Sequence, residues 1–90
     1  VGETTRVLSL EGLSEAAMRL LEDTLGEGEV TATVHGARRW ELEETALVGL
    51  WRLKAFEADG RQVGDWLEVA GVPSAIVEAN RRGTSTDLSI

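Results

Sequence analysis

The chain contains no cysteine and no tyrosine, one phenylalanine, one proline and one histidine. Without cysteine it can form no disulfide, no thiolate nucleophile and no Cys-based zinc or iron-sulfur site, so packing alone must hold the fold. No apolar run approaches the roughly 20 residues that span a bilayer, and the start, VGETTRVLSL, lacks the basic region and apolar core of a signal peptide. The sequence therefore predicts a cytoplasmic protein with no cofactor.

Basic residues are also few: nine Lys and Arg stand against sixteen Asp and Glu, for a net charge of −7. Nucleic acids and anionic membranes are bound by clustered positive charge, so we expect neither as a partner. The 90 residues, 42% hydrophobic and 28% charged, fit one globular domain over residues 1–90. Because the first residue is Val, we expect a C-terminal fragment of a longer protein.

The first half of the chain predicts a short strand and an amphipathic helix. Thr5 to Leu10 is a β-prone run, and Ser14 has the side chain and position of a helix N-cap. An apolar stripe at helical spacing follows, and Gly26 suits a C-terminal stop. Its members are Met18, Leu21 and Leu25. We expect this helix to bury the stripe against one face of a sheet.

From Glu29 the apolar period drops to two, which is typical of a strand with one buried face. A two-residue turn at Gly36 and Ala37 would pair Val34 with a charged residue, whereas a three-residue loop, Gly36 to Arg38, pairs Val34 with Trp40. The side-chain alternation therefore favours the three-residue loop. The same register pairs Ala32 with Leu42 and Thr31 with Glu43.

The second half predicts a further hairpin and a short helix. A strand from Leu47 to Phe56 leads into Asp59 and Gly60, a pair typical of type I′ turns. The returning strand can pair Lys54 with Asp65 near the turn and Leu53 with Leu67 further away, which requires a one-residue bulge near Gly64. In that shifted register Trp51 would face Val69.

Pro73 fits the start of a short helix that runs to about Arg82 and ends at Gly83, and the polar residues 84–90 are expected to be frayed. The prediction is an α+β fold. It has a mainly antiparallel sheet of four or five strands, one amphipathic helix on one face and a short C-terminal helix.

Few side chains suggest chemistry. His35 is expected to be a solvated histidine at a strand end, and Glu41 with Glu43 either a solvated strand face or two ligands of a hard cation. No phosphate-binding loop, serine elbow or paired nucleophile and base is present, so we expect no enzyme and name no catalytic or metal-binding residue. A metal or hydrolase site around these residues is the weakest hypothesis.

The 47–56 strand is apolar on both faces, which a sheet covered on one side does not require. Trp40, Trp51 and Trp66 can each be core residues or interface anchors. If Trp51 faces the helix, the opposite face is left for a partner. The predicted partner-binding residues are Val48, Leu50, Trp51, Arg52 and Phe56.

Three segments together resemble the C-terminal conserved region of the HupH (also called HyaF) hydrogenase-expression family. They are GEGEV at Gly26 to Val30, ELEETALVGLWRL at Glu41 to Leu53, and EVAGVPSAIVEA at Glu68 to Ala79. The resemblance implies an accessory protein or chaperone for an uptake nickel-iron hydrogenase that binds the iron-sulfur small-subunit precursor. Its partners would be a hydrogenase structural subunit or fellow maturation proteins. A homo-oligomerisation or scaffold domain, with a homodimer as its simplest form, is the alternative.

Overall fold

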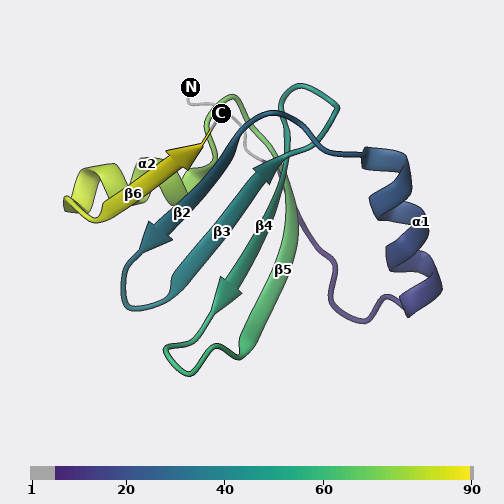
Figure 1. The fold of residues 1–90 in the computed structure, drawn as a ribbon, viewed down its shortest axis with the longest axis horizontal. Helices are drawn as coiled ribbons and strands as arrows, with labels where there is room; N and C mark the ends of the chain where they lie inside the picture. Colours follow the sequence, from purple (N-terminus) through teal and green to yellow (C-terminus); the bar gives the residue numbers. More distant parts are fainter. Residues whose placement is uncertain (1–5, 90) are drawn as a thin grey trace.

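The computed structural model describes residues 6–89, which form six strands and two helices. One antiparallel sheet contains all six strands in the order β1-β5-β4-β3-β2-β6, and Figure 1 shows α1 standing apart at one end of the view and α2 beside β6 at the other. The elements are β1 (Arg6–Ser9), α1 (Glu15–Leu25), β2 (Thr31–His35), β3 (Arg39–Glu44), β4 (Leu50–Phe56), β5 (Gln62–Val69), α2 (Ser74–Arg82) and β6 (Ser85–Ser89).

The α+β fold is confirmed, but the sheet has six strands rather than four or five. The additional strand is β6, in the segment predicted to be frayed, and it pairs with β2 so that Asp87 lies opposite Thr33. The prediction failed because β6 has a single apolar residue, Leu88, and lies at the sheet edge, where pairing needs backbone groups and little apolar burial. The expected strand from Thr5 to Leu10 is β1, with Thr5 outside the described residues.

The β2–β3 hairpin has the predicted register. Val34 pairs with Trp40 and Ala32 with Leu42, and the loop between the strands covers residues 36–38. These four side chains share one face of the sheet, which we call the core face. Together with Trp51, Leu53 and Ala79 of α2 they are the buried and part-buried centre of the domain.

The β4–β5 hairpin follows the prediction in part. Lys54 pairs with Asp65, and the register does shift by one residue near Gly64. However, the shift lies on the turn side of this pair, between Ala55 and Phe56, so that Phe56 pairs with Gln62. The second predicted register is wrong, since Leu53 pairs with Trp66 and not with Leu67.

The same register places Glu68, rather than Val69, opposite Trp51. A carboxylate thus lies on the core face, fully buried, where an apolar side chain was expected. Ser74 at the start of α2 makes this tolerable, because its backbone N–H and its hydroxyl both donate to the Glu68 carboxylate.

Two boundaries in this half also differ from the prediction. The strand β4 begins at Leu50, because Gly49 adopts φ 84° and residues 47–49 form a loop. The turn contains Asp59 and Gly60 but is not type I′, which needs positive φ at both central residues; only Gly60 has it. Glu57 instead closes a three-residue loop by donating to Arg61 O at 2.9 Å.

The helix on the core face is α2, not the helix that starts after Ser14. Pro73 and Gly83 flank α2 as predicted, and small or branched side chains let it approach the sheet: Ala75, Ile76 and Ala79. Ser14 does cap α1, accepting a hydrogen bond from Ala17 N at 3.1 Å, and Gly26 ends it with positive φ. However, Leu25 is the only buried residue of α1, so the prediction that this helix covers the apolar face is wrong.

Candidate functional site

The five predicted partner-binding residues lie in three different environments. Val48 is at the tip of the loop between β3 and β4 and is 95% exposed. Leu50 and Phe56 are half-buried at the two ends of β4, on the face opposite the core, which we call the open face. Trp51 points into the core, is 6% exposed, and donates its indole N–H to Ala70 O at 3.1 Å. The five residues therefore do not form one surface.

Arg52, the fifth of them, is on the open face but is already engaged. Its Nε and NH2 groups donate to the two carboxylate oxygens of Asp65 at 3.1 and 2.7 Å, and NH1 donates to Glu22 of α1. The hydrogen bond to Asp65, followed by that to Glu22, raises the pKa of Arg52, and the same Arg52 contact lowers the pKa of Glu22. Arg52 thus ties α1 to the open face.

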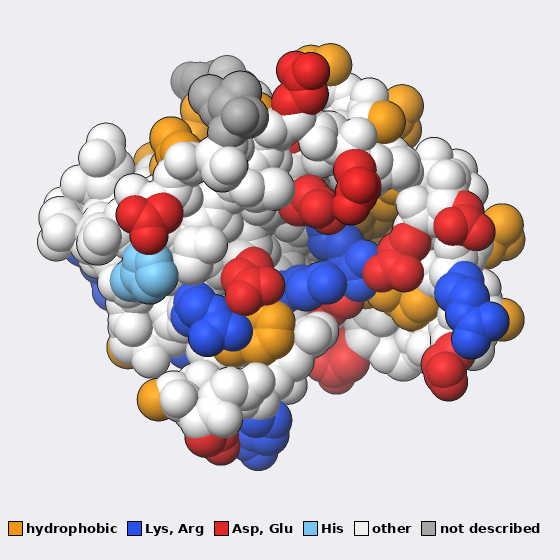
Figure 2. Space-filling model, viewed as in Figure 1, with side chains coloured by type: hydrophobic (Ala, Val, Ile, Leu, Met, Phe, Trp, Pro, Cys, Tyr) orange, Lys and Arg blue, Asp and Glu red, His pale blue; other side chains and the backbone are white. Residues whose placement is uncertain are grey.

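Five exposed apolar side chains lie on the segments that meet at the Val48 end of the sheet. We call this group the apolar rim; it comprises Val7, Leu47, Val48, Val69 and Val72, each more than half exposed. Ala70 N donates to Gly49 O at 2.9 Å and so joins the β3–β4 loop to the segment after β5. Figure 2 shows hydrophobic side chains at the upper edge of the molecule, where Figure 1 places the β3–β4 connection.

Sequence reasoning found only the Val48 part of the rim. Val69 was assigned to the ladder opposite Trp51, on the wrong face, and Val72 was passed over as a loop residue. The signal that could have found them is the run VAGV, in which two valines flank the small residues that follow β5.

The segments that carry the family resemblance interlock directly beneath this loop. Gly28 N donates to Glu44 O at 2.8 Å, Glu44 N to Val30 O at 2.9 Å, and Ala46 N to Leu25 O at 2.9 Å. A Cβ at Gly28 would lie 2.6 Å from the Glu44 carbonyl oxygen, so only glycine fits there. These motif residues therefore support the loop.

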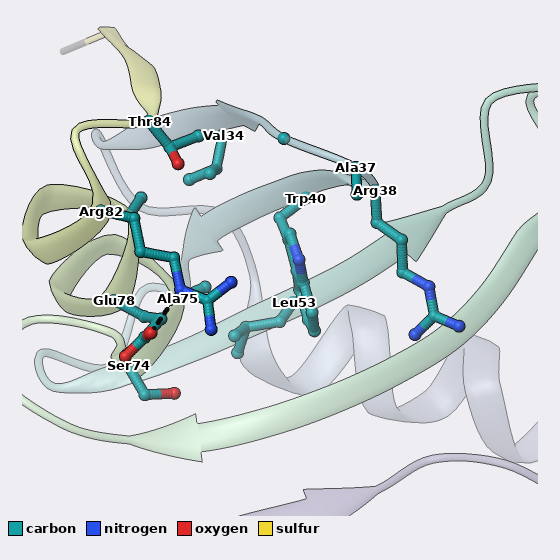
Figure 3. Close-up of a pocket in the computed structure, with 12 residues that line it drawn as sticks. Val34, Ala37, Arg38, Trp40, Leu53, Ser74, Ala75, Glu78, Arg82 and Thr84 are labelled. Carbon is teal, nitrogen blue, oxygen red and sulfur yellow. Dashed lines mark hydrogen bonds and ion pairs between the residues drawn. The ribbon is translucent and has the colours of Figure 1, made fainter.

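A groove of about 360 Å³ opens on the core face between α2 and the β2–β3 loop (Figure 3). Its apolar residues are Val34, Ala37, Trp40, Leu53, Ala75 and Ala79. The Trp40 ring is stacked on Trp66, with ring centroids 5.4 Å apart. Arg38 and Arg82 stand on opposite sides of Trp40 in the close-up. The sequence prediction did not include this groove, because it gave the C-terminal helix no position relative to the sheet.

The remaining candidates are surface contacts. His35 Nε2 lies 2.9 Å from Asp87 Oδ2, and Arg39 Nε donates to Glu41 at 3.1 Å. Within residues 6–89, no group of three His, Cys, Asp or Glu side chains is arranged to hold a metal ion. Neither α1 nor α2 has the length and apolar character that a membrane crossing demands.

Comparison with known proteins identifies the family. The sequence model described as "HupH hydrogenase expression protein, C-terminal conserved region" matches residues 2–84. The hydrogenase expression/formation protein HoxQ of Azotobacter vinelandii is 42% identical over 76 residues, which are 84% of this chain and 27% of that protein. The corresponding HupH of Rhizobium leguminosarum bv. viciae is 32% identical over 82% of this chain and 27% of its own length.

The chain thus spans about a quarter of the length of these curated relatives. A solved structure, hydrogenase expression protein HupH from Thiobacillus denitrificans, superposes with a TM-score of 0.74 at 30% identity, covering 89% of this chain and 73% of that one. Sequence and fold agree, and the chain belongs to the HupH hydrogenase expression protein family, within its C-terminal conserved region.

Proposed function

We propose that this chain is a protein-binding domain of an accessory protein for maturation of an uptake [NiFe] hydrogenase. In this proposal it acts in the cytoplasm, without enzymatic activity, and binds the iron-sulfur small-subunit precursor alone or together with fellow maturation proteins. Family membership supports the hydrogenase connection, because the relatives are named hydrogenase expression/formation proteins.

The single observation that carries the binding role is the exposure of Val48. Val48 is 95% exposed, and its loop is hydrogen-bonded to the segment that carries the exposed Val69 and Val72, which leaves apolar surface in water that a partner could cover. Of the predicted contact residues, Val48 therefore keeps a direct role and Leu50 a supporting one behind it. Trp51 and Arg52 act by positioning β4 and α1, because their polar groups are used within the domain. Phe56, at the far end of β4 and stacked under Arg39, is at most a separate contact.

The test is a pull-down of hydrogenase subunits by the full-length protein that contains this domain, with the fellow maturation proteins present. Val48→Asp should reduce retention of the small-subunit precursor at least tenfold, because it places a charge in the contact without removing any contact of the fold. The matched control is Val77→Asp, which puts the same charge on the exposed side of α2.

Two results would count against the proposal. If the wild-type protein retains no hydrogenase subunit, the proposed role in hydrogenase maturation is refuted. If Val48→Asp and Val77→Asp retain the precursor equally, the apolar rim is not the contact.

The alternative is a homo-oligomerisation or scaffold domain. The apolar rim favours this alternative if the surface that covers the rim belongs to another copy of this chain. β1 adds a reason, since it is an edge strand with exposed Val7 and Leu8. Light scattering separates the two: a homodimer that Val48→Asp converts to monomer supports this alternative, whereas a monomer that retains the precursor excludes it.

A further inference from the structure

We propose that the groove between α2 and the β2–β3 loop is a second binding site, which takes an acidic peptide segment with one large apolar side chain from a partner protein. The proposal goes beyond the hydrogenase role, because it depends on the groove and not on the identity of the protein that binds the apolar rim.

The floor of the groove is apolar and therefore favours a ligand with a large apolar side chain. The floor is formed by the side chains of Val34, Trp40 and Leu53, while Ala75 and Ala79 of α2 form the wall. Because both wall residues are alanines, α2 leaves a hollow of about 360 Å³, within the range of sites that bind ligands. A bulky apolar side chain in this hollow would contact the Trp40 ring, a residue type that often dominates interface energetics.

The Trp40 ring is held in position by the neighbouring Trp66 ring. The two rings are stacked, and a Cβ on Gly64 would overlap with the Trp66 ring, so the absence of a side chain at Gly64 makes room for the stacked pair. A floor that is held in place before binding loses little conformational entropy when a ligand arrives.

The charges at the mouth select an acidic ligand. Arg38 donates through Nε to Glu57 at 2.7 Å, and Arg82 donates through Nε to Glu78 at 2.7 Å. Among the described residues these contacts use one nitrogen of each guanidinium, so the terminal NH1 and NH2 groups of both can still donate to a carboxylate.

Arg81 adds a third positive charge and also donates to Glu78. The groove itself is lined by two arginines and one carboxylate, Arg38, Arg82 and Glu78. With Glu57 and Arg81, which are ion-paired to these lining residues, three arginines stand against two carboxylates in a chain that carries a net charge of −7. An excess of positive charge on an otherwise acidic protein steers an acidic segment to this groove and away from the rest of the surface.

The groove and the apolar rim are separate sites. Arg38 immediately precedes β3 and Val48 follows its far end, so Arg38 at the mouth of the groove and Val48 in the rim lie at opposite ends of the same strand. One partner at each end would let the domain hold two proteins at once.

The experiment is a selection of a random 12-residue phage-displayed peptide library on the full-length protein. We expect enriched peptides to carry Leu, Phe or Trp with Asp or Glu within three residues. A synthetic copy of the most enriched peptide should quench or shift tryptophan fluorescence, and the affinity measured from this signal should fall as salt concentration rises.

Charge reversal then tests the site. Arg82→Glu and Arg38→Glu should each weaken the synthetic peptide at least tenfold, since both side chains are exposed and can be replaced without loss of the fold. Arg19→Glu, an equal charge change on α1, and Val48→Asp in the rim should change the affinity less than twofold.

Several outcomes would overturn the proposal: no enrichment, enrichment of basic peptides, or equal binding by Arg82→Glu and Arg19→Glu. A dimer in light scattering that Arg82→Glu converts to monomer would also overturn it, because the occupant would then be a second copy of this chain.

Discussion

Removing the buried carboxylate of Glu68 should be among the most damaging single changes in this domain. The side chain is fully buried on the core face, opposite Trp51. It accepts hydrogen bonds from Ser74 N at 3.1 and 3.2 Å and from Ser74 Oγ at 3.2 Å. Because Ser74 is the first residue of α2, the carboxylate also faces the positive end of the helix dipole. Glu68 therefore joins β5 to α2.

The size of the effect follows from these contacts. A hydrogen bond to a charged group contributes about 1.5–3 kcal/mol, and Glu68→Ala removes both the backbone and the hydroxyl bond and leaves a cavity. We expect a loss of about 3–5 kcal/mol in the free energy of unfolding. Glu68→Gln keeps the shape and one acceptor oxygen, so about 1–2 kcal/mol should be lost. A domain of this length is stabilised by roughly 5–13 kcal/mol in total.

Urea denaturation followed by tryptophan fluorescence measures these differences directly. Glu29→Ala, on an exposed loop, should stay within about 0.5 kcal/mol of wild type, and Ser74→Ala should lose only the hydroxyl bond. A double-mutant cycle between Glu68→Gln and Ser74→Ala should show coupling, because the two side chains share that bond. If Glu68→Ala unfolds at the same urea concentration as Glu29→Ala, the carboxylate does not hold α2.

Two further predictions concern α1 and the motif loop. The hydrogen bond from Arg52 lowers the pKa of Glu22 from its usual 4.5, so the stabilisation from this pair is complete above that value and is lost as pH falls through the lower folded-state pKa. Glu22→Gln should therefore flatten the acid side of the stability curve, and an unchanged slope would contradict the tether. Gly28→Ala should cost about 1–3 kcal/mol because its Cβ would meet the Glu44 backbone, whereas Gly71→Ala, which meets no atom within 4 Å, should not destabilise; equal melting temperatures would refute this.

Local signals in the sequence were sufficient where one physical cause decided the structure. The alternation of apolar and polar residues fixed the β2–β3 register, because a one-residue slip would have turned Val34 and Leu42 to the solvent. The helix ends were likewise predicted from a local cause at Ser14, Pro73 and Gly83. Each of these residues satisfies or ends backbone hydrogen bonding within a few residues.

The rest depended on contacts between distant segments. Apolar matching favoured Val69 opposite Trp51, and it failed because Ser74 satisfies a buried carboxylate at position 68. The choice of helix on the core face failed similarly: α1 has the longer apolar stripe, but α2 follows β5 directly and its alanines permit a closer approach. Of the candidate site, Val48 could be foreseen from its sequence, whereas the groove could not.

The family motifs and the proposed contact are physically linked. Thr45, buried beside Gly28, donates its backbone N–H to Leu50 O at 2.9 Å, and its hydroxyl accepts from Leu47 N at 3.1 Å. Gly49, which closes the loop with positive φ, accepts a hydrogen bond from Ala70 N. The loop that exposes Val48 is thus fixed at both ends before any partner binds, and a fixed apolar side chain binds with a smaller entropy loss than a mobile one. The glycines and threonine in the segments that carry the family resemblance therefore explain how such an apolar residue can be presented at the surface.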